Sequence, residues 1–351
     1  MKARRLGFIV ALLILLFIVV SLITTKLVYD AQFPRHNRPD EAITAALRYS
    51  DIAEEHPRIL VSFPSGKNNL QGYLYTVENP RALMVISHGL GGGADSYLSQ
   101  IRFFIDQGLA VFAFDNTGSY DSEGKSTRGF PQSLVDLDAA LSYISLQPEL
   151  AKLPLLLFGH SWGGYAVANV LNYPHDIQAV ISVSGPSTAM DMIIEQGQRA
   201  MGNFIYSQYP FLWLYQHLLF GKAASLDAVT AINSSGIPFL IIHGIADEMI
   251  DYEGSALIAR RENITNERVR FITATTESRN GHNNLFRSDD AISYIQEVNI
   301  RYRALYDSHN QDIPYEVKKA FYNEIDRSIV HQLEPTLMVE IKQFIDKVLE
   351  F

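Results

Sequence analysis

Four short runs of almost wholly apolar residues constrain the fold of this chain more than any other feature. Each run is too short for a typical helix, and stretches with helical spacing separate one from the next. Such runs are typical of strands that are buried on both faces of a parallel sheet. The sequence therefore predicts an α/β fold, with a mostly parallel sheet flanked by helices. The runs are ALMVIS (82–87), LAVFAF (109–114), LPLLLF (153–158) and AVISVS (179–184).

Similar patterns continue on both sides of these runs. RILVSF and LQGYLYTV surround the turn-like SGKNN and predict a hairpin, while PFLIIHG and RVRFITA predict two further strands. Apolar residues at helical spacing predict helices between strands, at 96–108, 130–147 and 163–174.

The first residues of the chain differ from the rest. From Leu6 to Ile23 every position but two is apolar, which is enough helix to cross a hydrocarbon core of about 30 Å. Three basic residues precede this run and Lys26 follows it, and positive charge tends to stay cytoplasmic. We predict an uncleaved single-pass anchor in the cell membrane, with the body of the protein extracytoplasmic. The alternative is a cleaved signal peptide and a secreted protein, but SLITTKLVYD offers no small-x-small cleavage site.

We divide the chain into an anchor, a linker with a short helix capped by Asp40, and a domain with two additions. One addition is a long insertion between two strands, interpreted as a helical cap. The other is a set of extra helices before the last helix. The boundaries are 1–28 for the anchor, 29–57 for the linker and 58–351 for the domain, with the cap at about 186–235 and the extra helices at about 289–334.

Composition excludes several classes of function. The chain has no cysteine, which excludes disulfides, thiolate metal sites and a cysteine nucleophile. Its formal net charge is −9, and lysine and arginine do not cluster beyond the N-terminal segment, so we expect no nucleic-acid partner.

GHSWGG at 159–164 directly follows one of the apolar runs and precedes a predicted helix. A serine flanked by glycines two residues to either side, on a turn from strand to helix, is typical of an exposed nucleophile. The motif therefore indicates Ser161 as the nucleophile. The alternative is a tight corner without chemistry.

A serine hydroxyl needs a base within hydrogen-bonding distance, and that base needs an orienting carboxylate. His282 in GHNN and Asp247 in HGIADE both follow predicted strands, and the order serine, aspartate, histidine is the one this architecture uses. Glu248 and Asp251 are alternatives for the acid. Three other histidines at strand ends are expected to shape turns: His88, His160 and His243.

Acyl transfer also requires N–H donors for the developing oxyanion, one after the nucleophile and one in an earlier loop. Trp162 and Leu90 stand at these positions. HGLGGG, which contains Leu90, has neither the G-x-G-x-x-G spacing nor the Gly-Lys-Ser/Thr of a phosphate-binding loop. We therefore predict an oxyanion hole and no nucleotide site.

HGLGG, GHSWGG, HGIAD and GHNN resemble motifs of the α/β-hydrolase superfamily, over roughly 58–282 and the last helix. The branch that they resemble contains serine aminopeptidase-like enzymes, monoacylglycerol lipases and related esterases. The resemblance implies Ser161 as nucleophile, His282 as base and Asp247 as acid, with Leu90 and Trp162 as the oxyanion hole. DNTGSYDSEG is similar to a loop of the same branch, but has threonine at 117 where the branch has arginine and tyrosine at 120 where it has glycine.

The predicted cap contains many aromatic residues, more than a solvated loop would expose. We assign four of them to substrate binding, and the alternative is that they pack the cap onto the body of the domain. The four are Phe204, Tyr209, Phe211 and Trp213.

The sequence thus predicts a membrane-anchored serine hydrolase that cleaves a carboxylic ester, with a small ester or acyl compound as substrate and no metal or organic cofactor. A serine peptidase with the same triad is the alternative. An aminopeptidase needs an acidic subsite for the substrate amine, for which Glu195 is the candidate. A third hypothesis is a non-catalytic binding protein on this fold.

Overall fold

A computed structural model describes residues 2–350, and its centre is one eight-stranded sheet. The strand order is β1-β2-β4-β3-β5-β6-β7-β8. β2 runs antiparallel to β1 and β4, and the strands from β4 to β8 are parallel. The predicted fold class is therefore confirmed. The strands are β1 (Arg58–Ser65), β2 (Asn68–Tyr75), β3 (Leu83–Ser87), β4 (Ala110–Phe114), β5 (Leu155–His160), β6 (Ala179–Val183), β7 (Phe239–Gly244) and β8 (Val269–Ala274).

The continuous apolar runs follow from burial of the sheet on both faces. Successive side chains of a strand point to opposite faces. In β3, Leu83 and Val85 enter one core cluster, whereas Met84 and Ile86 enter the other. Every residue of β3 is therefore buried, and a polar residue at any of these positions would lose its hydration.

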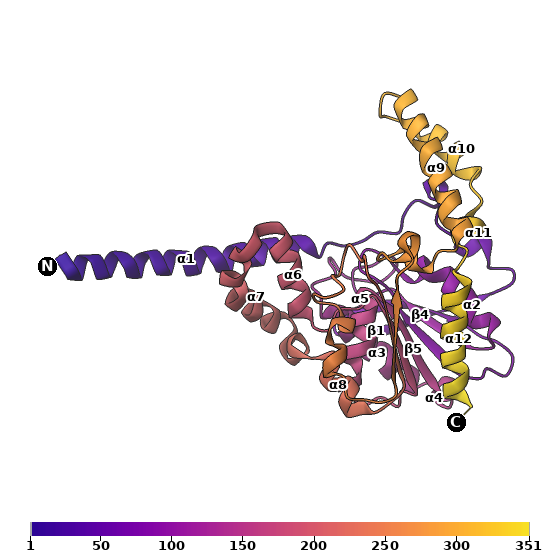
Figure 1. Cartoon of the computed structure of the whole chain (residues 1–351), viewed down its shortest axis with the longest axis horizontal. Coiled ribbons are helices and arrows are strands. Elements are labelled where there is room, and N and C mark those ends of the chain that lie inside the picture. Colours follow the sequence, from indigo (N-terminus) through magenta and orange to yellow (C-terminus); the bar gives the residue numbers. More distant parts are fainter. Residues whose placement is uncertain (1, 351) are drawn as a thin grey trace.

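Helices cover both faces of the sheet (Figure 1). The first core cluster includes residues of α3 (Gln132–Ser145), α5 (Trp162–Asn169) and α8 (Ala228–Ser235). The second includes residues of α2 (Leu98–Asp106) and α12 (Pro335–Leu349). The short α4 (Pro148–Ala151) precedes β5.

Two groups of helices extend beyond these layers. α6 (Ala189–Met201) and α7 (Ile205–Phe220) lie between β6 and β7 in the sequence, and α7 lies beside α1. α9 (Asp289–Ser308) and α10 (Tyr315–Asn323) form a hairpin that projects from the body, with α11 (Arg327–Val330) at its base (Figure 1). The hairpin has a small core of its own, centred on Val298 and Phe321.

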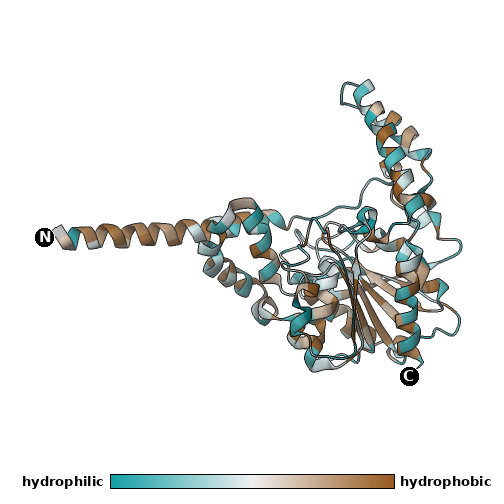
Figure 2. Ribbon diagram, viewed as in Figure 1, coloured by the Kyte–Doolittle hydropathy of each residue, from teal (hydrophilic) through white to brown (hydrophobic). Residues whose placement is uncertain are grey.

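The chain begins with α1 (Lys2–Gln32), a helix long and apolar enough to cross a membrane (Figure 2). Most of its apolar side chains are exposed in the protein. Its last turns are different, because Tyr29 is 3% exposed and Phe33, just after the helix, is 6% exposed. Both belong to the main core, so the end of α1 is part of the folded domain.

The segment that we interpret as a linker is also docked on the domain. The guanidinium of Arg35 donates hydrogen bonds to the carbonyl oxygens of Tyr120, Ser122 and Gly124. The guanidinium of Arg38 forms ion pairs with two aspartates of the domain, Asp95 and Asp121. Composition predicts a polar, proline-containing linker here, and the structure differs because these polar groups have partners on the domain.

The short helix expected behind Asp40 does not form. Asp40 does accept a hydrogen bond from Ala42 N, but the turn η1 ends at Ile43. Thr44 is extended, and its hydroxyl accepts a bond from Ala46 N, which competes with helix formation. The structure has two 3-10 turns instead, η1 (Glu41–Ile43) and η2 (Tyr49–Asp51).

Candidate active site

Ser161 occupies the turn between β5 and α5, at the carboxyl end of a central strand. Its backbone has φ 58° and ψ −116°, a conformation that non-glycine residues rarely adopt and that functional sites often hold. Its N–H donates to the carbonyl oxygen of Val183 on β6, which holds the turn in place. The turn is therefore sharp and supported from the neighbouring strand.

The glycines of the motif are required by close backbone contacts. A Cβ on Gly159 would lie 2.2 Å from the carbonyl oxygen of Gly163, and a Cβ on Gly163 would lie 1.9 Å from that of Ser87 on β3. Side chains at these two positions would push α5 away from the sheet. The spacing of the motif thus reflects the contact between helix and strand that positions Ser161.

The structure brings together the three side chains predicted to act as a triad. Ser161 Oγ lies 2.8 Å from His282 Nε2. On the other side of the ring, His282 Nδ1 lies 2.8 Å from Asp247 Oδ2 and 2.9 Å from Oδ1. His282 is 5% exposed and Asp247 is 7% exposed, so water screens these contacts little.

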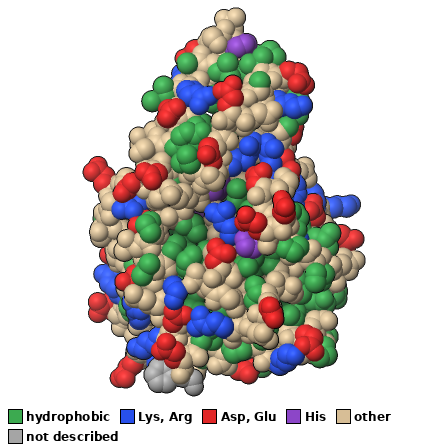
Figure 3. All heavy atoms as spheres, turned by 90° about the vertical axis from the view of Figure 1, so that its right-hand side faces the viewer, with side chains coloured by type: hydrophobic (Ala, Val, Ile, Leu, Met, Phe, Trp, Pro, Cys, Tyr) green, Lys and Arg blue, Asp and Glu red, His purple; other side chains and the backbone are tan. Residues whose placement is uncertain are grey.

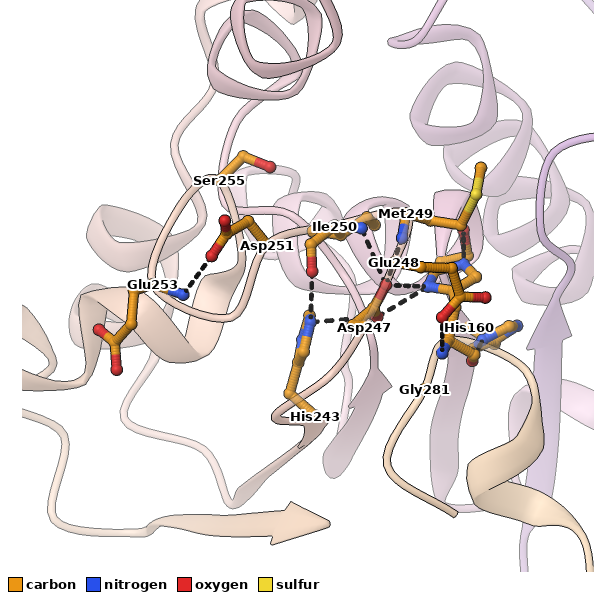
Figure 4. Close-up of polar contacts among 12 residues, drawn as sticks. His160, His243, Asp247, Glu248, Met249, Ile250, Asp251, Glu253, Ser255 and Gly281 are labelled. Atoms are coloured by element: carbon orange, nitrogen blue, oxygen red, sulfur yellow. Dashed lines mark hydrogen bonds and ion pairs between the residues drawn. The ribbon is translucent and has the colours of Figure 1, made fainter. Parts of the chain in front are cut away.

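Asp247 is held as a carboxylate by four donors around it (Figure 4). Its Oδ1 accepts hydrogen bonds from the backbone N–H groups of Met249 and Ile250. Burial alone would raise its pKa, but the contacts with His243 and His282 outweigh burial and hold the pKa of Asp247 well below its usual range. The group facing the His282 ring is therefore charged at neutral pH.

The two alternative acids lie elsewhere in the same loop. Glu248 accepts a hydrogen bond from the backbone N–H of His282, through Oε2 at 3.0 Å, and so supports the main chain rather than the ring. Asp251 Oδ1 accepts from Glu253 N. Asp247 is thus the carboxylate that contacts the imidazole.

The two residues predicted to supply the oxyanion hole, Leu90 and Trp162, lie in segments next to Ser161. Trp162 is the first residue of α5, and the N–H groups of a first helical turn have no partner within the helix. Its side chain is fully buried, and the indole N–H donates to the carbonyl oxygen of Phe130. Leu90 lies in the loop after β3, next to Gly89. A Cβ added to Gly89 would lie 3.4 Å from Ser161 Cβ. The loop therefore passes close to the serine.

Comparisons with known proteins agree with this fold. Residues 78–225 match the family model Hydrolase_4, described as serine aminopeptidase, S33. The human monoglyceride lipase is 24% identical over 210 residues, which cover 51% of this chain and 69% of that protein. A solved esterase from Pyrococcus furiosus has a TM-score of 0.53, with 16% identity, over 78% of this chain and 95% of that one. The chain has the α/β-hydrolase fold.

Two further relatives match parts of this chain. The quorum-quenching protein AidA of Acinetobacter baumannii is 30% identical over 141 residues, 38% of this chain and 46% of that protein. The uncharacterized protein YfhR of Escherichia coli is 24% identical over 178 residues, 51% of this chain and 57% of that protein. Together the comparisons show similarity to hydrolases, among them a lipase and an esterase.

The three histidines expected to shape turns all contact loops of the site. His88 Nδ1 lies 2.7 Å from the carbonyl oxygen of Gly89, and its Nε2 accepts from Asn116 N. Burial lowers the pKa of His88 to about 4, so its ring is neutral. His243 lies within 3.2 Å of Asp247, a contact that the sequence analysis did not identify.

A buried chain of hydrogen bonds joins the oxyanion loop of the hydrolase to His282. His160 Nε2 lies 2.9 Å from the carbonyl oxygen of His282, which can only accept, so this nitrogen carries the proton. His160 Nδ1 is then the acceptor for the hydroxyl of Tyr97, at 2.8 Å. The Tyr97 oxygen accepts in turn from Gly89 N, at 3.0 Å. Sequence reasoning missed Tyr97, because a tyrosine at the start of a helix carries no motif.

The loop after β4 explains one departure from the branch pattern. Tyr120 stands where the branch has glycine and has φ 38°, a left-handed conformation that glycine adopts without strain. Its ring lies under the Arg38 guanidinium, 5.0 Å from its centroid, and this contact favours tyrosine despite the backbone.

Three of the four aromatic residues assigned to substrate binding are exposed in the α6–α7 region, and the fourth, Phe211, is half-buried. Phe204 is 58% exposed, Tyr209 is 44% exposed, and Trp213 stacks on His217 one turn further along α7. Phe211 meets the ring of Phe17 on α1. Their assignment to a substrate pocket stays a prediction.

Glu195, the candidate for an amine subsite, is engaged within the protein. Its Oε1 accepts from Asp251 N and from the Arg199 guanidinium, and its Oε2 accepts from Ser255 N. The carboxylate therefore ties α6 to the loop that carries Asp247. As for metals, no group of three or more potential ligands occurs within residues 2–350.

Proposed function

We propose that this hydrolase is a membrane-anchored, extracytoplasmic enzyme that cleaves carboxylic esters through an acyl-serine intermediate. The observation that carries the proposal is the contact of Ser161 Oγ with His282 Nε2 at 2.8 Å, with Asp247 at 2.8 Å from the opposite nitrogen. The esterase and lipase relatives support an ester as substrate.

In the proposed reaction, Ser161 Oγ attacks the ester carbonyl carbon while His282 Nε2 takes the hydroxyl proton. The N–H groups of Leu90 and Trp162 stabilise the oxyanion of the tetrahedral intermediate. The intermediate collapses as His282 gives its proton to the leaving alcohol. Water, deprotonated by His282, then releases the acid from Ser161. Asp247 keeps the imidazole in the tautomer with the proton on Nδ1 and stabilises its charged form.

The anchoring part of the proposal is supported by the length and apolarity of α1 and by the basic residues before it. Its last turns also pack into the domain through Tyr29 and Phe33. Cleavage near Ile23 would keep Tyr29 and Phe33 but would remove Phe17, whose ring contacts Phe211. This contact between α1 and α7 supports an uncleaved anchor over a signal peptide.

The proposed chemistry is tested with the full chain in detergent or vesicles. A fluorophosphonate probe should label the wild-type protein and fail to label Ser161→Ala, while the exposed control Ser207→Ala labels normally. Turnover of p-nitrophenyl esters should be lost with the labelling. A well-folded wild-type protein that does not react would contradict the proposal, and turnover of aminoacyl anilides without ester turnover would favour the peptidase.

The proposed topology is tested in intact cells. A protease added outside should remove the domain and leave α1 in the membrane fraction. Full protection of the domain would overturn the extracytoplasmic location.

A further inference from the structure

The α6–α7 region contains a long stretch without formal charge. From Ala200 to Gly221 the sequence has no aspartate, glutamate, lysine or arginine, and Arg199 and Lys222 flank it on either side. Aromatic and aliphatic residues occupy most of the stretch. Such a stretch in a globular protein is normally buried, because a helix that is apolar all round belongs in a core or in lipid.

α7 is apolar all round but is not buried. Only three of its residues are buried: Ile205, Leu212 and Gln216. Large apolar side chains of α7, of the turn before it and of the last residue of α6 are 40% to 73% exposed. They are Met201, Phe204, Tyr206, Tyr209, Trp213, Leu214 and Leu218. We call this set the α7 surface.

The helix beside α7 is the predicted membrane span. Phe211 meets Phe17 edge to face, with ring centroids 5.9 Å apart. Further along both helices, Tyr215 meets Tyr29 at 5.3 Å, and its hydroxyl lies 2.6 Å from Asp30 Oδ1. On α1, Ser21, Thr25 and Tyr29 recur every four residues and are the buried positions of the helix. The remaining faces of α1 are exposed.

The position of Phe17 along α1 indicates how deep α7 would lie in a bilayer. Phe17 is six residues before the end of the apolar run at Ile23, which corresponds to about 9 Å along a helix. If α1 spans the membrane, the ring of Phe211 lies below the membrane surface with it. The end of α7 that carries Tyr215 then lies near Lys26 and Asp30, the charged residues just beyond the apolar run.

We propose that α7 is embedded in the outer leaflet of the bilayer, beside α1, with the α7 surface in contact with lipid. This inference rests on the proposed membrane anchor. Tyrosine and tryptophan are favoured at the interface of hydrocarbon and headgroups, and the cations Arg199 and Lys222 suit the headgroup region. The opposite side of the molecule is different, since acidic and basic side chains are spread across it (Figure 3).

α6 joins the embedded helix to the loop that carries Asp247. Arg199, at the end of α6 that leads into α7, donates to the carbonyl oxygens of Glu248 and Met249. Gln196 on α6 also donates to Met249 O, at 2.7 Å. Lipid contact at α7 therefore fixes the loop that carries Asp247 at a set distance from the membrane.

Fluorescence quenching by lipid tests the proposal, because the chain has two tryptophans in different environments. Trp162 is fully buried and Trp213 is 45% exposed on α7. The full chain is reconstituted in phosphatidylcholine vesicles with and without bromine in the acyl chains. Brominated lipid should reduce the emission of the wild-type protein, and this loss should disappear in Trp213→Phe. Quenching of Trp213 by aqueous iodide but not by brominated lipid would overturn the proposal.

Two further variants, both made in the Trp213→Phe background, separate this inference from the anchor on which it rests. Phe17→Trp reports on α1, and Leu146→Trp reports on an exposed apolar position beyond α3 that should remain in water. Brominated lipid should quench the first and not the second. Quenching of Phe17→Trp without quenching of Trp213 would refute only the embedding of α7. No quenching at either Phe17→Trp or Trp213 would refute the anchor itself.

Discussion

His243 Nε2 lies 3.2 Å from Asp247 Oδ2, so the carboxylate that contacts His282 has a second imidazole beside it. The same nitrogen lies 3.1 Å from the carbonyl oxygen of Ile250, which can only accept. His243 therefore carries its proton on Nε2 and donates toward both groups. The contact fixes one carboxylate oxygen from the side away from His282 and closes the loop between Asp247 and Ile250.

From this geometry we expect His243 to be a positioning residue. His243→Phe should lower kcat for an ester by about tenfold, because a hydrogen bond to a charged group is lost, and should leave KM nearly unchanged. His243→Gln, which keeps a donor at a similar place, should recover most of the rate. His175→Phe is a matched control, since His175 also contacts a carboxylate, Asp138, at 2.7 Å. Equal losses in the phenylalanine and glutamine variants would show a packing role instead.

Tyr97 gives a second prediction, because its hydroxyl joins Gly89 N to His160. Tyr97→Phe should lower kcat several-fold, since the loop that carries Leu90 loses a hydrogen bond and His160 loses its donor. The burst of acylation in rapid-mixing experiments should slow to the same extent. Tyr143→Phe, a tyrosine packed on Phe63 away from this chain of bonds, is the control. A normal rate in Tyr97→Phe would mean that the chain of bonds serves stability alone.

The eight strands and the triad could be predicted from sequence because their signals are local. A strand buried on both faces produces a continuous apolar run, and the backbone contacts of Gly159 and Gly163 produce a motif. The docking of Arg35 and the contact between Phe17 and Phe211 depend on segments far apart in the sequence. From the composition of its segment, Arg35 is expected to lie in solvent. The three carbonyl groups to which it donates come close to it only in the folded chain.

The third prediction concerns stability at acidic pH and depends on a buried histidine, His331. Burial, together with the Arg287 guanidinium beside the ring, lowers the pKa of His331 to about 4. In the unfolded chain a histidine has a pKa near 6.5, so between about 4 and 6.5 the unfolded state binds a proton that the folded state does not. His331 therefore destabilises the fold progressively as pH falls through this window.

The variant His331→Gln cannot take up that proton in the unfolded state. Its unfolding free energy, relative to wild type, should rise by up to about 1.4 kcal/mol for each pH unit below 6.5 and level off near pH 4. Other buried titratable groups, such as Asp115, are present in both proteins, so their contributions to the pH dependence cancel in this difference. Thermal midpoints in detergent between pH 7.5 and 4.5 provide the measurement. A constant difference over this range would show that the pKa of His331 is the same in the folded and unfolded states.

Glu195 gives the last prediction, and it separates the esterase from the aminopeptidase. Its carboxylate accepts from Asp251 N at 3.0 Å and from Ser255 N at 2.7 Å, so it supports the loop after β7. Glu195→Gln weakens both bonds by removing the charge, and we expect kcat/KM to fall several-fold. Because the effect passes through the loop, it should be equal for alanine p-nitrophenyl esters with a free or an acetylated amine. Glu253→Gln, with its exposed ion pair to Arg261, should change neither rate. A loss confined to the free-amine ester would mean that Glu195 binds the substrate amine, and the aminopeptidase would then replace the esterase as the preferred function.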